Sequence, residues 1–193
     1  GQGWSTANLT VNGSVEVYTT ALVTPSIHSA NLVFSAVQAN QMTLSWNTGN
    51  GANRIVVARA GSAPTGTPVD GTTYNVNAPL GNGTVVYNGP GDSFTATGLT
   101  AGTVYYFTIY EYNGSGVGSK YRGVFTPGSG NHTTLAAPPT TQASGVNFTS
   151  VTGSSMTINW AAGNGANSLV VVKAGAAVNS DPLGGTTYTA NAT

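Results

Sequence analysis

The stretch that decides the fold reads Leu-Thr-Ala-Gly-Thr-Val-Tyr-Tyr-Phe-Thr-Ile-Tyr-Glu-Tyr-Asn-Gly-Ser-Gly and spans Leu99–Gly116. Large side chains alternate along its middle with a period of two, which is typical of a β-strand. One face would carry Tyr105, Phe107 and Ile109, and the other would carry Tyr106, Thr108 and Tyr110.

Turn residues bound this strand on both sides. Ala101-Gly102-Thr103 precedes it and Asn113-Gly114 follows it, and both contain residues that tolerate the backbone angles of a reversal. Leu99 stands just before the first turn and Tyr105 just after it. This spacing predicts a tyrosine corner, in which the phenol hydrogen-bonds to an upstream backbone group.

The same positions resemble a strand signature of fibronectin type III domains. The matching residues are Leu99, Gly102, Thr103, Tyr105, Phe107, Ile109, Asn113 and Gly116. The sequence departs from the usual form at Ala101, where many members have Pro, and at Glu111, where a small residue is common. The resemblance implies an antiparallel β-sandwich.

A second copy of part of the sequence lies further along the chain. Met42-Thr-Leu-Ser-Trp46 returns as Met156-Thr-Ile-Asn-Trp160, and Gly49-Asn-Gly-Ala-Asn53 returns as Gly163-Asn-Gly-Ala-Asn167. Roughly 20 of about 37 aligned positions are identical at an offset of about 114 residues, a level of identity that indicates tandem modules. Trp46 and Trp160 should therefore have equivalent surroundings.

The repeat divides the chain into three predicted segments. Residues 1–23 are predicted to be the C-terminal end of a preceding sandwich, with its last strand at Ser14–Thr20. Residues 24–137 form one complete fibronectin type III-like domain, and residues 138–193 form the N-terminal part of another. The last part should expose Trp160 and Val171, at a cost of roughly 1.5 to 3 kcal/mol per large side chain, unless strands from elsewhere cover them.

The predicted fold class is all-β, an antiparallel Greek-key β-sandwich of the fibronectin type III or immunoglobulin-like kind. Because Arg54–Ala60 is apolar on both faces, its outer side should be covered, and Gly61–Gly83 is the long connection that would cover it. Besides the strand between the turns at 101–103 and 113–114, short strands are expected at 32–37, 42–46, 54–60, 84–87, 93–97 and about 130–134.

Composition restricts the classes of partner. Charged residues make up 5% of the 193 residues and the net charge is zero, so the chain has no basic patch for nucleic acid. It has no Cys, and its apolar runs are far shorter than the roughly 18 to 20 residues that span a bilayer.

The sequence predicts no catalytic residues, no cofactor and no metal site. The acids are dispersed over different strands and loops, which favours solvated charges over a catalytic pair: Glu16, Asp70, Asp92, Glu111 and Asp181. His28 and His132 have no Cys or second His at metal-ligand spacing.

Three features are candidates for binding. Tyr106, Tyr110 and Tyr112 could form an aromatic face for sugars or for a neighbouring subunit, unless the 61–83 connection folds over them. Lys120, Tyr121 and Arg122 lie in a loop that fibronectin-like modules often use for ligands, and ordinary loop solubility is the alternative. The two Gly-Asn-Gly-Ala-Asn copies indicate a demanding turn more than a ligand site.

These features favour a non-catalytic structural or interaction segment, secreted or at the cell surface, in an adhesin stalk, spacer or filament. The sequence style also resembles the repeat modules of large secreted or surface proteins from Bacteroidota-type bacteria. The alternatives are accessory modules of a secreted polysaccharide- or protein-degrading enzyme, and a carbohydrate-binding module. Expected partners are neighbouring repeats, identical subunits, or cell-surface or matrix glycans.

Overall fold

The computed structural model describes residues 23–123 and 128–190, which divide into two compact units. Unit 1 extends to Leu135 and unit 2 begins at Ala136. The strand predicted at Ser14–Thr20 lies outside the described residues.

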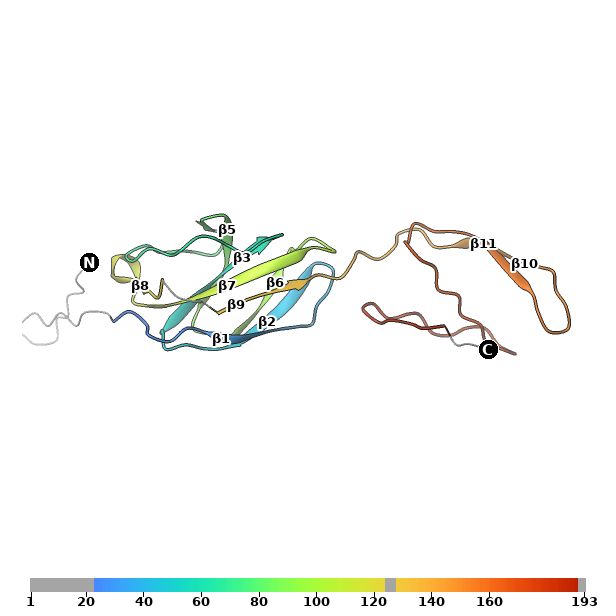
Figure 1. Cartoon of the computed structure of the whole chain (residues 1–193), viewed down its shortest axis with the longest axis horizontal. Coiled ribbons are helices and arrows are strands. Elements are labelled where there is room, and N and C mark those ends of the chain that lie inside the picture. Colours follow the sequence, from blue (N-terminus) through green and yellow to red (C-terminus); the bar gives the residue numbers. More distant parts are fainter. Residues whose placement is uncertain (1–22, 124–127, 191–193) are drawn as a thin grey trace, which may run out of the picture. The chain divides into compact units, whose positions relative to one another are not determined.

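Unit 1 consists of two antiparallel β-sheets (Figure 1). The first has the order β1 (Ala30–Ser35), β2 (Gln41–Asn47) and β6 (Ser93–Thr97). The second has the order β4 (Pro79–Leu80), β5 (Gly83–Gly89), β3 (Asn53–Ala60), β7 (Val104–Asn113) and β8 (Lys120–Tyr121), and β9 (Gly128–Thr133) also pairs with β7. The chain changes sheet between β2 and β3, between β5 and β6, and between β6 and β7. This arrangement confirms the predicted antiparallel β-sandwich.

The structure differs from the predicted strands at several boundaries. β1 and β9 each begin two residues before their predicted starts at 32 and 130, and β5 runs to Gly89, two residues beyond its predicted end at 87. β4 and β8 were not predicted. Each is only two residues long and pairs at the end of a longer strand, so neither carries a periodic pattern that a sequence could reveal.

The main core lies between the two sheets and confirms the predicted alternation along β7. Phe107 and Ile109 point into it, and Tyr105 packs against it. The remaining buried members come from β2, β3 and β6: Met42, Leu44, Trp46, Val56, Ala58 and Ala96. The Trp46 ring contacts Tyr87 edge-on at a centroid distance of 5.8 Å, and the large indole fills the space between the sheets.

The predicted tyrosine corner is present at the entry to β7. The Thr100 amide donates a hydrogen bond of 3.0 Å to the phenolic oxygen of Tyr105. Gly102 in the intervening turn has φ +61°, a conformation that glycine adopts without strain. The phenol therefore closes the bend that leads into the strand.

Unit 2 contains a two-stranded sheet of β10 (Ser144–Thr149) and β11 (Thr157–Ala161). Its register repeats that of β1 and β2 at an offset of 114: Phe34 faces Leu44, and Phe148 faces Ile158. Trp46 and Trp160 thus hold equivalent strand positions, but the prediction of equivalent surroundings is wrong, because 5% of Trp46 and 39% of Trp160 is exposed. The reason is that no second sheet covers β10 and β11 among the described residues.

Residues 168–173, the counterpart of most of β3, are not a strand in unit 2. In unit 1 the β3 strand is hydrogen-bonded on one side to β5 and on the other to β7. A strand of this kind gains its backbone partners from its neighbours, so the same sequence pattern without them does not form a strand.

Candidate functional site

Three of the six predicted contact residues are buried on the outer face of the larger sheet. Tyr110, Tyr112 and Tyr121 join the strand β3 residues Ile55 and Val57 in a second apolar cluster. Each phenol donates a hydrogen bond, Tyr110 to the Gly66 carbonyl at 2.8 Å, Tyr112 to Asn88 Oδ1 at 2.6 Å and Tyr121 to the Thr72 carbonyl at 3.0 Å.

The connection between β3 and β5 covers this face. The sequence analysis left this cover open as the alternative to an exposed aromatic face. Leu80 is buried in the cluster, and Tyr74 and Ala78 pack against it. Burial raises the pKa of Tyr121 to about 12, and the nearby Tyr112 phenol adds to the rise. Tyr110, Tyr112 and Tyr121 therefore serve a second core and offer no exposed ladder for stacking.

The other three predicted contact residues are partly exposed, and each makes a different contact. Tyr106 is half-buried, and on β3 its cross-strand neighbour is Arg59. The Lys120 ammonium lies 3.0 Å from Asp70, a pair exposed to solvent. Arg122 donates to the carbonyl of Pro25 at 3.2 Å, which ties the loop to the segment that enters unit 1.

Asp70 is held in its charged form by these contacts. Its carboxylate accepts the Tyr121 amide at 2.8 Å as well as the Lys120 ammonium. The amide is the largest cause of its lowered pKa, and Lys120 adds to the effect. The carboxylate thus anchors the start of β8.

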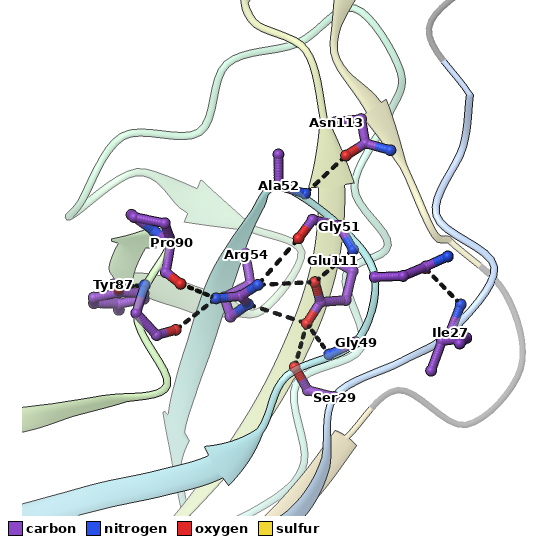
Figure 2. A network of polar contacts seen from close by, with 12 residues as sticks. Ile27, Ser29, Gly49, Gly51, Ala52, Arg54, Tyr87, Pro90, Glu111 and Asn113 are labelled. Carbon is purple, nitrogen blue, oxygen red and sulfur yellow. Dashed lines mark hydrogen bonds and ion pairs between the residues drawn. The ribbon is translucent and has the colours of Figure 1, made fainter.

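Glu111 corrects the interpretation of the acids as solvated charges. Its side chain is fully buried, at 0% exposure, on the core-facing side of β7. Oε1 accepts hydrogen bonds from the Ser29 hydroxyl, the Gly49 amide at 2.9 Å and Arg54 Nε at 3.1 Å. Oε2 accepts the Gly51 amide at 3.1 Å and Arg54 Nη2 at 3.3 Å. Figure 2 shows these donors converging on the carboxylate.

Arg54 completes the network from the neighbouring strand, β3. Besides pairing with Glu111, its guanidinium donates to the carbonyls of Pro90, Gly91 at 2.6 Å and Gly51 at 3.1 Å (Figure 2). A buried ion pair is stable when hydrogen bonds satisfy its remaining donors and lone pairs, and this one meets that condition. The network joins the residue before β1, the β2–β3 turn, β3, the turn after β5, and β7.

The network around Glu111 and Arg54 is structural, because protein groups already fill its hydrogen-bonding positions. Both carboxylate oxygens are occupied by protein donors, and Arg54 is nearly enclosed, so neither group faces a cleft where a substrate could bind. Both Glu111 and Arg54 can be read in the sequence, but the sequence analysis did not pair them. The two residues are direct cross-strand partners of β3 and β7, a register that the sequence analysis did not derive.

The other predicted chemistry-bearing residues do not come together. Asp92 and Asp181 are exposed, and Glu16 lies outside the described residues. Within residues 23–123 and 128–190, no group of three His, Cys, Asp or Glu side chains is placed to hold a metal ion. In the same part of the chain, no helix has the length and apolar character needed to cross a membrane.

No protein-family model matches the sequence, and no curated protein matches it. Solved structures that resemble the chain include an FN3 domain of human collagen XX, with 20% identity, 58% of this chain and 96% of that one covered, and a TM-score of 0.38. For a two-domain fibronectin type III segment from chicken tenascin, the identity is 19% and the TM-score is 0.39. The match covers 68% of this chain and 61% of that one. The fibronectin type III domain of human fibronectin type III domain containing protein 3 has 17% identity, coverages of 62% and 94%, and a TM-score of 0.41. The fold class stated above rests on the strand order and pairing of unit 1.

Proposed function

We propose that the chain is a non-catalytic structural segment of a long extracellular repeat protein, acting as a spacer, adhesin stalk or filament. The observation that carries the proposal is the recurrence of local geometry at an offset of 114 residues. The β1–β2 and β10–β11 registers match, including the same irregularity near the start of each pair. The turn hydrogen bond from the Val69 amide to Tyr74 recurs from Leu183 to Tyr188.

The charge inventory gives independent support. In the part of the chain that the structure describes, the buried acid and base neutralise each other, and the remaining acids lie at the surface. The exposed pair of Lys120 and Asp70 anchors β8, which fits a module that works through its shape and its contacts.

The test is the sequence on either side of this segment combined with its location on intact cells. Further copies of the Gly-Asn-Gly-Ala-Asn turn at a spacing of about 114 residues, together with removal of the protein by protease added outside intact cells, support a surface repeat protein. A protein that is protected inside cells contradicts the extracellular assignment.

Two alternative functions use the same modules. A hydrolase domain in the flanking sequence would make the segment an accessory of a secreted enzyme. A carbohydrate-binding module requires an exposed aromatic platform, and Tyr106 is the member of the predicted tyrosine face that is not buried. Binding of residues 24–137 to a glycan array, lost in Tyr106→Ala, would favour that alternative.

The apolar face of unit 2 supports a role in assembly. Phe148 of β10, Trp160 of β11 and Met156 just before β11 are exposed and line one hollow with exposed Leu169 and Val171. The unit 1 counterparts of Phe148, Met156 and Trp160 belong to the main core or pack against it. Those of Leu169 and Val171 are Ile55 and Val57, which belong to the second apolar cluster. Further strands would cover this face in the working protein, either from the same chain or from an identical subunit, since an apolar patch of this kind marks an interaction surface.

A further inference from the structure

The segment that leads into each unit is held by the side chain of one asparagine. In unit 1 the Asn50 Oδ1 atom accepts the amides of Ser26 and Ile27, both at 2.9 Å. In unit 2 the Asn164 Oδ1 atom accepts the amides of Thr140 and Thr141, at 3.1 and 2.9 Å. The three residues of one set lie 114 positions from those of the other, so the same contact is built twice.

The rest of the contact recurs as well. Asn50 Nδ2 donates to the Ser26 hydroxyl at 2.9 Å, and Asn164 Nδ2 donates to the Thr140 hydroxyl at the same distance. The backbone amide of Asn50 donates to the Ile27 carbonyl at 3.4 Å, and that of Asn164 donates to the Thr141 carbonyl at 3.2 Å. Each asparagine thus binds its segment through the side chain and the backbone together.

The glycine before each asparagine is required by the same contact. A Cβ atom at Gly49 would lie 2.2 Å from the Ile27 carbonyl oxygen, and one at Gly163 would lie 2.1 Å from the Thr141 carbonyl oxygen. Both distances are too short for any side chain. The Gly-Asn step of the repeated turn is therefore explained by the segment that it receives.

The ion pair does not account for this recurrence. Ser29 and Arg54 belong to the network around Glu111, but the residues 114 positions later are Ala143 and Ser168. Unit 2 keeps the asparagine contact although it has neither the serine nor the arginine at the positions that correspond to Ser29 and Arg54. It is thus a separate device from the buried network.

We propose that Asn50 and Asn164 are latches, each a binding site in the β2–β3 turn, or its counterpart, for two successive amides of the incoming chain. In unit 1, Asn113 and Arg122 add bonds to the carbonyls of Val23 at 2.7 Å and Pro25 at 3.2 Å. Leu135 is bonded within unit 1 through Gln38 and Gly102. The latch at Thr140 therefore limits the free connection to residues 136–139, which include two prolines.

Hydrogen exchange of the whole 193-residue chain, followed residue by residue by NMR, tests the latch. Asn50→Ala removes the acceptor of two amides, so the exchange of Ser26 and Ile27 should become about tenfold faster while the β2 and β3 amides keep their rates. Asn50→Asp keeps an oxygen at this position and should retain the protection. The exposed Asn75 provides the matched control, Asn75→Ala, which should leave Ser26 and Ile27 unchanged.

Three results would overturn the latch. Unchanged exchange in Asn50→Ala removes it, and so does an equal acceleration throughout unit 1, because Asn50 would then support the fold as a whole. Loss of protection in Asn50→Asp equal to that in Asn50→Ala removes the assigned acceptor. If Asn50→Ala does not fold, Asn164→Ala reports on Thr140 and Thr141 instead. These readouts concern the exchange of single amides, so their outcome does not depend on whether the proposed extracellular role is correct.

Discussion

Glu111 of strand β7 and Arg54 of strand β3 form a buried ion pair, with 3.1 Å between Arg54 Nε and Glu111 Oε1 and side-chain exposures of 0% and 3%. In a chain with 5% charged residues, this pair places two charges inside the fold. The charges are stable there because they neutralise each other and because the surrounding backbone satisfies their remaining hydrogen-bonding groups.

Glu111→Ala should lower the free energy of unfolding by about 3 to 5 kcal/mol, because it leaves the Arg54 charge buried without its partner. Denaturation by urea measures the change. Adding Arg54→Met should recover part of the loss by removing that charge, while the amides of Gly49 and Gly51 stay without their acceptor. The exposed Asp92→Ala is the control, and a Glu111→Ala loss no larger than that of the control would show that the pair does not stabilise the fold.

Much of this fold was predictable, and the pair shows where the prediction stopped. Alternation along Tyr105, Phe107 and Ile109 predicted the core face of β7 correctly. The same alternation places Glu111 on that face, but a carboxylate in a core is unfavourable without a partner. The sequence analysis did not identify that partner. The partner depends on the β3–β7 register, which long-range pairing sets and local pattern does not.

The candidate site was predicted less well than the fold, for the same physical reason. The sequence located the tyrosines on one face of the strand but could not show whether the 61–83 connection covers them. That depends on the placement of Leu80 and Tyr74, which lie in a segment with no periodic pattern. In unit 2, residues 168–173 are the counterpart of most of β3, but a strand there needs neighbours to form.

Tyr105→Phe should lower the free energy of unfolding by about 1 kcal/mol, since the Thr100 amide loses its acceptor at the tyrosine corner. Thermal or urea unfolding of unit 1 measures the change. Tyr106→Phe is the matched control on the next residue and opposite face, where the same loss of a hydroxyl should have a smaller effect. Equal effects of the two substitutions would contradict a specific role for the corner.

The buried phenol of Tyr121 should make the fold sensitive to alkali. Its pKa is raised to about 12 in the folded chain, against about 10 when unfolded. The unfolded chain therefore loses this proton first, so the stability contributed by the neutral phenol is complete below pH 10 and is lost as the pH rises towards 12. Urea midpoints of the native chain between pH 8 and 11.5 should fall more steeply than those of Tyr121→Phe. Parallel curves would rule out this source of alkaline sensitivity.

Trp160 should be far more accessible than Trp46, because their exposed fractions are 39% and 5% although they hold equivalent strand positions. In a chain carrying Trp4→Phe, acrylamide should quench two populations of tryptophan fluorescence, and adding Trp160→Phe should remove the strongly quenched one. If Trp160 is instead quenched as weakly as Trp46, its face is covered in solution. A dilution series then separates the causes: quenching that rises on dilution identifies an identical subunit as the cover, and constant quenching identifies cover from the same chain.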